Sequence, residues 1–189
     1  MAQAQVRTTL SSEDNPRGIP KARFIEDVDA FVAEASGDGD LVLKILQETL
    51  AKYRFMESSS VQRRAGLEEK VPELERTIEM VELLIAKKEQ GASFDTTFEL
   101  ADTLYAKGRV DEVDEVYIWL GASTMLSYPL DSAHTLLLGK LDAARGTLGT
   151  VKDDLLFLRD QITVTEVNVA RVYNWDVARR RQDRMKTAV

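Results

Sequence analysis

Residues 130–172 read LDSAHTLLLGKLDAARGTLGTVKDDLLFLRDQITVTEVNVARV, and one spacing runs through the whole stretch. Steps of four and three residues connect Leu130, His134, Leu137, Leu141, Ala144, Leu148, Val151, Leu155, Leu158, Ile162, Thr165, Val169 and Val172. Eleven of these thirteen positions are apolar. A mean spacing of about 3.5 residues is typical of a left-handed coiled coil, whereas the helix of an ordinary globular domain has a period of about 3.6. The stretch therefore predicts a long coiled-coil helix.

A second run of the same length lies earlier in the chain. It passes through Leu43, Leu46, Leu50, Tyr53, Glu57, Ser60, Arg64, Leu67, Val71, Leu74, Ile78, Val81 and Ile85. We call the positions of both runs the seam. Two equal runs separated by one gap predict an antiparallel hairpin of two helices. Each helix of about 50 residues would be about 70 Å long, which favours an extended arm over a compact domain.

The first run contains two irregularities. Glu57, Ser60 and Arg64 are consecutive polar seam positions. They either form a layer that fixes the register, with Glu57 and Arg64 close enough to pair, or they weaken the seam and leave the apolar residues opposite free for a partner. Pro72 predicts a kink or a break, because proline removes a helical hydrogen bond and clashes with the preceding turn.

The segment between the helices, residues 92–129, has the alternating pattern of half-buried strands. It divides into two strand–turn–strand halves, with turns near "LADT" and "LGAS". Two hairpins alone are marginal in water, and their unpaired edges and apolar faces invite pairing with other chains. We therefore predict assembly through this segment. The candidate assembly residues are Phe94, Phe98, Leu100, Leu104, Tyr105, Val116, Ile118, Trp119, Leu120 and Met125.

Composition excludes several classes of protein. The formal net charge of −7 argues against a dedicated nucleic-acid binder, and the basic cluster formed by Arg179, Arg180, Arg181, Arg184 and Lys186 is interpreted as a solvated tail. The sequence has no cysteine, so it has no disulfide scaffold and no thiol nucleophile. No apolar run reaches the roughly 18 residues that a membrane span needs. The first 20 residues are polar and lack the apolar region of a signal peptide, so a disordered tail is expected there.

No motif of an enzyme or of a metal site is found. The single histidine, His134, occupies a seam position and is expected to be a packed or capping residue. The "GDGD" of residues 37–40 lacks the spacing and the closing glutamate of a calcium-binding loop, so it is expected to be a loop before a helix. We expect no catalytic residue, no cofactor and no metal.

Five motifs resemble the α-class subunits of the prefoldin family, and eukaryotic members most closely. They are FIEDVDAFV (24–32), KYRFME (52–57), ELADTLYAK (99–107), VYIWLGASTMLSY (116–128) and FLRDQITVTEVNVARVYNWDV (157–177). The resemblance covers about residues 18–181. It implies a mainly helical fold with little β-structure, in which the long coiled-coil hairpin is joined through two β-hairpins that oligomerise into β-barrels.

The resemblance also implies function and partners. Prefoldin is a hexamer of two α-class and four β-class chains that holds unfolded actin and tubulin without ATP. It passes them to the cytosolic group II chaperonin, so a cytoplasmic location is expected, with no membrane or nucleic-acid partner. The expected division of the chain is a disordered tail (1–20), a short helix and the first long helix (21–91), the paired β-hairpins (92–129), the second long helix (130–178) and a basic disordered tail (179–189).

Apolar residues outside the seam separate two hypotheses for the arm. A static coiled-coil adaptor needs polar outer faces, whereas a chaperone that holds unfolded chains needs exposed apolar side chains. The candidate client-binding residues are Phe55, Met56, Val164, Val167, Tyr173 and Trp175. An alternative stays open for Tyr173 and Trp175, which could instead pack on the N-terminal segment around Phe24, Val28 and Phe31 as a small local core.

Overall fold

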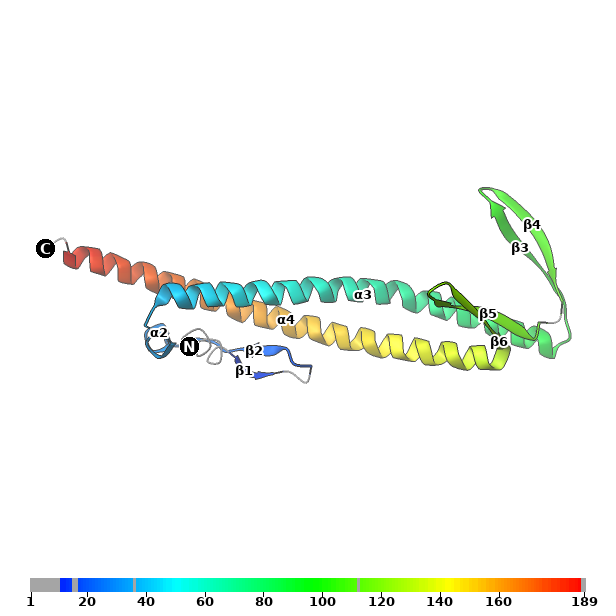
Figure 1. Cartoon of the computed structure of the whole chain (residues 1–189), viewed down its shortest axis with the longest axis horizontal. Helices are drawn as coiled ribbons and strands as arrows, with labels where there is room; N and C mark the ends of the chain where they lie inside the picture. Colours follow the sequence, from blue (N-terminus) through cyan, green and yellow to red (C-terminus); the bar gives the residue numbers. More distant parts are fainter. Residues whose placement is uncertain (1–10, 15–16, 36, 112, 188–189) are drawn as a thin grey trace. The chain divides into compact units, whose positions relative to one another are not determined.

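The structure, a computed structural model, describes residues 11–14, 17–35, 37–111 and 113–187. The chain forms two compact units. The first, here called the terminal unit, comprises residues 1–63 and 151–189, and the second, the hairpin unit, comprises residues 64–150. The elements and their order along the chain are shown in Figure 1.

Two long helices supply most of both units. Helix α3 spans Gly39–Glu89 and helix α4 spans Leu130–Thr187. Every predicted seam position on both helices is buried or half-buried, which confirms the heptad prediction. In the hairpin unit, an ion pair joins Glu75 to Arg145, and His134 Nε2 lies 3.1 Å from a carboxylate oxygen of Glu82. Because residue numbers rise on one helix as they fall on the other, the helices are antiparallel there.

The terminal unit repeats this antiparallel arrangement. Arg54 pairs with Glu166 at 2.7 Å, and Asp40 at the start of α3 pairs with Arg180 near the end of α4 at 2.5 Å. The polar seam positions Glu57 and Ser60 follow Arg54 along α3 and are half-buried.

Arg64, the third polar seam position, belongs to the hairpin unit and is also half-buried. Its guanidinium lies 3.8 Å from Glu68, one turn along the same helix. The structure therefore shows a pair within α3 for Arg64, whereas one of the two alternatives from the sequence had Glu57 as its partner.

Of the kink or break expected at Pro72, the break is wrong, because α3 continues through this residue. Pro72 is exposed, while its neighbours Val71 and Leu74 pack against the core formed by Ile78, Val81, Leu130, Leu137 and Leu141. Packing on both sides of the proline offsets the roughly 3 kcal/mol that a helical proline costs.

The two predicted β-hairpins are confirmed. Strand β3 (Phe94–Ala101) pairs with β4 (Leu104–Val110), and β5 (Glu115–Gly121) pairs with β6 (Thr124–Pro129), both antiparallel and in separate sheets. The turns fall where the sequence places them. Ala122 and Ser123 both have positive φ angles, 48° and 57°, as a two-residue type I′ turn requires.

The N-terminal part of the chain differs from the expected disordered tail. Strands β1 (Ser11–Asp14) and β2 (Pro20–Ala22) form a short antiparallel pair. Helix α2 (Val28–Ala35) lies beyond that tail, where a short helix was expected. The physical reason is that α3 and α4 bind the chain from residue 17 onward, beginning with an ion pair of 2.5 Å between Arg17 and Asp154. The rest of the tail, residues 1–10, 15 and 16, lies outside the described residues.

The basic C-terminal segment is also not a disordered tail as far as residue 187, because α4 continues that far. Arg180 bridges Asp176 at 2.7 Å and Asp40 at 2.5 Å. The hydrogen bond and the charge of Asp176, followed by the charge of Asp40, raise the pKa of Arg180 above its ordinary value. Arg179 stacks over the Trp175 ring, 5.3 Å from its centroid. These contacts hold the helix together where composition alone predicts disorder. Residues 188 and 189 lie outside the described residues.

Candidate functional site

The β-hairpins expose an unusual number of large apolar side chains. We call these the hairpin surface, namely Phe98, Leu100, Leu104, Tyr105, Tyr117, Trp119, Leu120, Met125 and Leu126, each exposed by more than 40%. Both hairpins are two-stranded, so each has two edges with unpaired main-chain groups. The hairpin surface is therefore built to pair with another chain.

Strand β5 is apolar on both faces. Val116 and Ile118 turn inward and pack against the helical core of the hairpin unit. Tyr117 and Trp119 remain 71% and 59% exposed. The helices thus cover Val116 and Ile118, and leave Tyr117 and Trp119 largely exposed within the described part of the hairpin unit.

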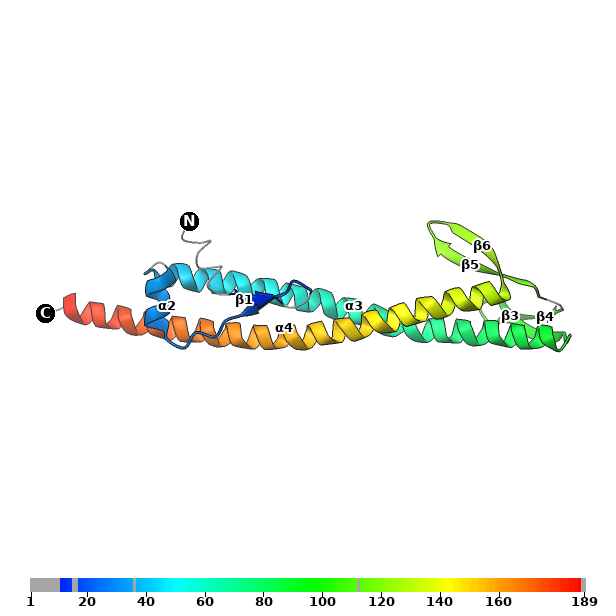
Figure 2. The same ribbon diagram turned by 90° about the horizontal axis from the view of Figure 1, so that it is seen from below.

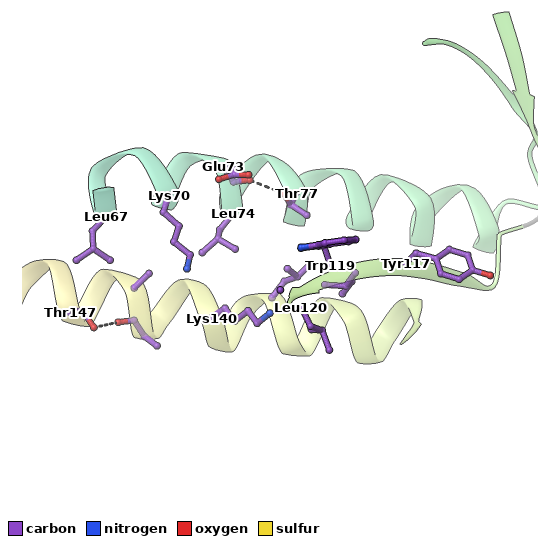
Figure 3. Close-up of a pocket in the computed structure, with 15 residues that line it drawn as sticks. Leu67, Lys70, Glu73, Leu74, Thr77, Tyr117, Trp119, Leu120, Lys140 and Thr147 are labelled. Carbon is purple, nitrogen blue, oxygen red and sulfur yellow. Dashed lines mark hydrogen bonds between the residues drawn. The ribbon is translucent and has the colours of Figure 1, made fainter. Parts of the chain in front are cut away.

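An open cleft of about 730 Å³ lies where β5 meets the two helices. Figure 3 shows Trp119 and Leu120 at the end of the strand between the helices, with Lys140 of α4 near Leu120 and Lys70 of α3 farther along the cleft. Leu67, Leu74 and Leu137 supply apolar lining. The cleft is continuous with the hairpin surface through Trp119.

Seven of the ten predicted assembly residues belong to the hairpin surface, and Phe94, Val116 and Ile118 are half-buried. The prediction missed Tyr117 and Leu126. A signal for Tyr117 was present, because the unbroken apolar run VYIWL (116–120) is typical of a strand buried on both faces.

The predicted client-binding residues divide into three groups in the terminal unit. Phe55, Tyr173 and Val167 are 75%, 55% and 42% exposed. Met56 and Val164 are half-buried. Trp175 is held in a cage, where its indole N–H donates to Asp29 Oδ1 at 2.6 Å and its ring packs against the core of the terminal unit. The local-core alternative thus describes Trp175, whereas Tyr173 points to solvent.

A row of polar residues on the helices was missed. Gln161, Thr165 and Asn168 are buried on α4, at spacings of four and three residues. Gln161 and Asn168 bond to the main chain of residues 22–25, which lies along the helices in both views (Figures 1 and 2). Gln161 and Asn168 lie outside the predicted seam. Thr165 occupies a seam position, so it is the one member of this row whose burial the heptad pattern predicted.

Other kinds of site find no support among the described residues. The described ranges contain no group of three or more histidine, cysteine, aspartate or glutamate side chains that could hold a metal ion. His134 is half-buried and lies 3.1 Å from Glu82, as a packed seam histidine would. No described helix is both long and apolar enough to cross a membrane.

Comparison with known proteins agrees with this geometry. A family model described as "Prefoldin subunit" matches residues 53–175, which include the hairpins and most of both long helices. The chain belongs to the prefoldin family.

Individual prefoldins extend the match toward both ends. Prefoldin subunit 3 of Elsinoe fawcettii is 49% identical over 176 residues, which cover 93% of this chain and 89% of the relative. Prefoldin subunit 3 of Homo sapiens is 47% identical over 167 residues, covering 88% and 85%. Among solved structures, filamentous prefoldin from Methanocaldococcus jannaschii matches at a TM-score of 0.40 and 12% identity, over 59% of this chain and 95% of that one. Prefoldins are chaperone subunits, so the family agrees with a non-enzymatic chain.

Proposed function

We propose that this chain is an α-class subunit of a hexameric prefoldin with one further α-class and four β-class partners. The observation that carries the proposal is the hairpin surface, which leaves Trp119, Tyr117 and Phe98 exposed beside unpaired strand edges. Pairing of these edges with those of neighbouring subunits would bury the surface and close β-barrels. A hydrophobic surface of this kind is typical of a permanent interface.

The proposed activity is to hold unfolded chains, such as actin and tubulin, without ATP and to transfer them to the group II chaperonin in the cytoplasm. The exposed off-seam side chains of Phe55, Val167 and Tyr173 support it. Each of these side chains would bury only a small apolar area against a client. The burial would contribute about 2 kcal/mol of binding free energy per contact. Several such contacts along one unfolded chain act together, because binding at one raises the local concentration at the next.

The test uses the hexamer reconstituted from all six subunits. Denatured actin is diluted into it without nucleotide, and aggregation is followed by light scattering; chaperonin and ATP are then added and native actin is measured. The triple variant Phe55→Ser, Val167→Ser and Tyr173→Ser should assemble normally but suppress aggregation less. The control is Met80→Ser, which removes a comparably exposed side chain from the hairpin unit. Full suppression by the triple variant would favour the static adaptor.

A further inference from the structure

The segment from Arg17 to Ala35, here called the strap, is bound to the helices through its main chain. Tyr53 Oη donates to the carbonyl oxygen of Pro20 at 2.8 Å, and the N–H of Ala22 donates to Gln161 Oε1 at 2.9 Å. Farther along the strap, Arg171 donates to the carbonyl oxygen of Glu26 at 2.6 Å. Side chains of α3 and α4 therefore recognise backbone groups of the strap.

Asn168 makes the most informative of these contacts. Its Oδ1 accepts from the N–H of Ile25 at 3.0 Å, and its Nδ2 donates to the carbonyl oxygen of Arg23 at 2.8 Å. One amide side chain thus binds an N–H and a C=O two residues apart, as a neighbouring β-strand would. Asn168 and Gln161 are only 1% and 5% exposed, so these polar groups need partners whenever the groove is closed.

Two apolar anchors complete the groove. Ile25 and Phe31 of the strap are buried against Val42, Ile45 and Val172 of the helices. The neighbouring Phe24 is exposed, and the guanidinium of Arg171 lies over it, 5.2 Å from the centroid of the Phe24 ring. The groove therefore combines backbone recognition, which any extended peptide satisfies, with sockets that require only an apolar side chain.

We infer that this groove is a peptide-binding site for extended apolar segments of unfolded proteins, and that the strap is its built-in occupant, which a client displaces. The inference rests on the proposed function and deepens it by naming a site and the form in which a client is bound. In the empty protein the strap has the advantage of being covalently attached. A long unfolded chain that is already bound at other surfaces of the hexamer is also present at a high local concentration near the groove, so it can compete with the attached strap.

Hydrogen exchange on the wild-type hexamer tests the displacement. The amides of Ala22 and Ile25 donate to Gln161 and Asn168, so both should be protected in the empty hexamer. Addition of denatured actin should speed their exchange, while the amide of Gly91, which donates to Lys88 in the hairpin unit, should be unchanged. Bound actin with unchanged protection at Ala22 and Ile25 would overturn the inference and leave the proposed function standing.

A binding assay tests the groove without a client protein. The probe is a fluorescent peptide with the sequence of residues 18–34, GIPKARFIEDVDAFVAE, and its control is the same peptide with aspartate in place of Ile25 and Phe31. Ile25→Asp with Phe31→Asp removes the anchors from the strap, and should raise the affinity of the hexamer for the peptide by about tenfold or more, since each buried anchor contributes more than 1.4 kcal/mol. The aspartate-substituted peptide should bind no better than before, because it lacks both apolar anchors.

The groove variant Asn168→Leu identifies where the peptide binds. In the strap-released hexamer it should abolish most of the gain, because it leaves the peptide's N–H and C=O without partners. Asn174→Leu is the matched control, since Asn174 is exposed on the same helix. No gain on strap release, or equal loss with both variants, would overturn the inference. Peptide capture by a hexamer that fails to hold actin would instead contradict the proposed function alone.

Discussion

Gly39 and Trp175 show how one missing side chain can shape a site. A Cβ atom at Gly39 would lie 2.7 Å from Cζ3 of Trp175, closer than real Cβ contacts come. The absence of a side chain at the first residue of α3 therefore lets the indole reach Asp29. The cage around Trp175 depends on this glycine as much as on its polar partners.

Gly39→Ala should consequently destabilise the terminal unit by about 1–3 kcal/mol, because the indole must move or the helix must shift. The measurement is chemical denaturation followed by Trp175 fluorescence in a Trp119→Phe background. Gly66→Ala is the comparison, because no atom lies within 4 Å of the added Cβ and the position is an exposed helix interior. It should stabilise by about 0.5–1 kcal/mol. Equal effects of the two changes would show that Trp175 does not need the space.

At the scale of the helix, two neighbouring leucines separate seam from surface. Leu158 is fully buried, whereas Leu156, two residues away on α4, is 65% exposed. Leu158→Asp should cost several kcal/mol, because it places a charge in a packed apolar layer. Leu156→Asp should change stability by about 0.5 kcal/mol or less.

Circular dichroism during thermal unfolding distinguishes these two variants. Assembly should survive in both, because the hairpin surface belongs to the other unit. Loss of the hexamer in Leu158→Asp would show that the long helices also hold the subunits together.

Substitution of Pro72 is expected to stabilise the protein, in contrast to the substitution of Leu158. Because α3 already continues through this exposed position, Pro72→Ala restores a helical hydrogen bond without disturbing the seam. We expect stabilisation by about 1–3 kcal/mol, seen as a higher urea midpoint with an unchanged slope. A lower midpoint would mean that the helix is shaped around the proline.

Elements were predictable where a single periodic signal dominates. Heptad spacing located α3 and α4, and strand alternation with turn residues located both hairpins. Packing of Trp175 on the N-terminal segment was one alternative that the sequence offered. The main-chain binding of the strap was not predictable, because it depends on side chains such as Asn168, which meets Arg23 and Ile25 only after the whole chain has folded. The C-terminal helix was misjudged for the same reason, since its basic composition hides the ion pairs of Arg180 with Asp176 and Asp40. Local patterns reveal elements, whereas contacts between distant segments decide how those elements end and what covers them.

At the scale of the whole molecule, the hairpin surface should govern assembly. Tyr117→Ser with Trp119→Ser removes two large, mostly exposed side chains of β5 and leaves Val116 and Ile118 packed on the helices. Co-expressed with partner subunits, this variant should fail to give a discrete hexamer by native mass spectrometry, because the apolar area that drives association is lost. Phe55→Ser, which removes an even more exposed ring in the terminal unit, should assemble normally. If the Tyr117 and Trp119 variant still forms a hexamer, the exposed side chains of β5 are not needed for the interface between subunits.

The strap also has a consequence for how the chain is made. Ile25 and its partner Asn168 are 143 residues apart. Translation proceeds at about 5–20 residues per second, so the ribosome finishes the strap roughly 7–30 seconds before it makes the helix that receives it. During that interval the side chains of Ile25 and Phe31 have no groove to enter. The strap is therefore among the first described parts of the terminal unit to be synthesised and among the last to be ordered, and the newborn chain carries an apolar segment that itself requires protection.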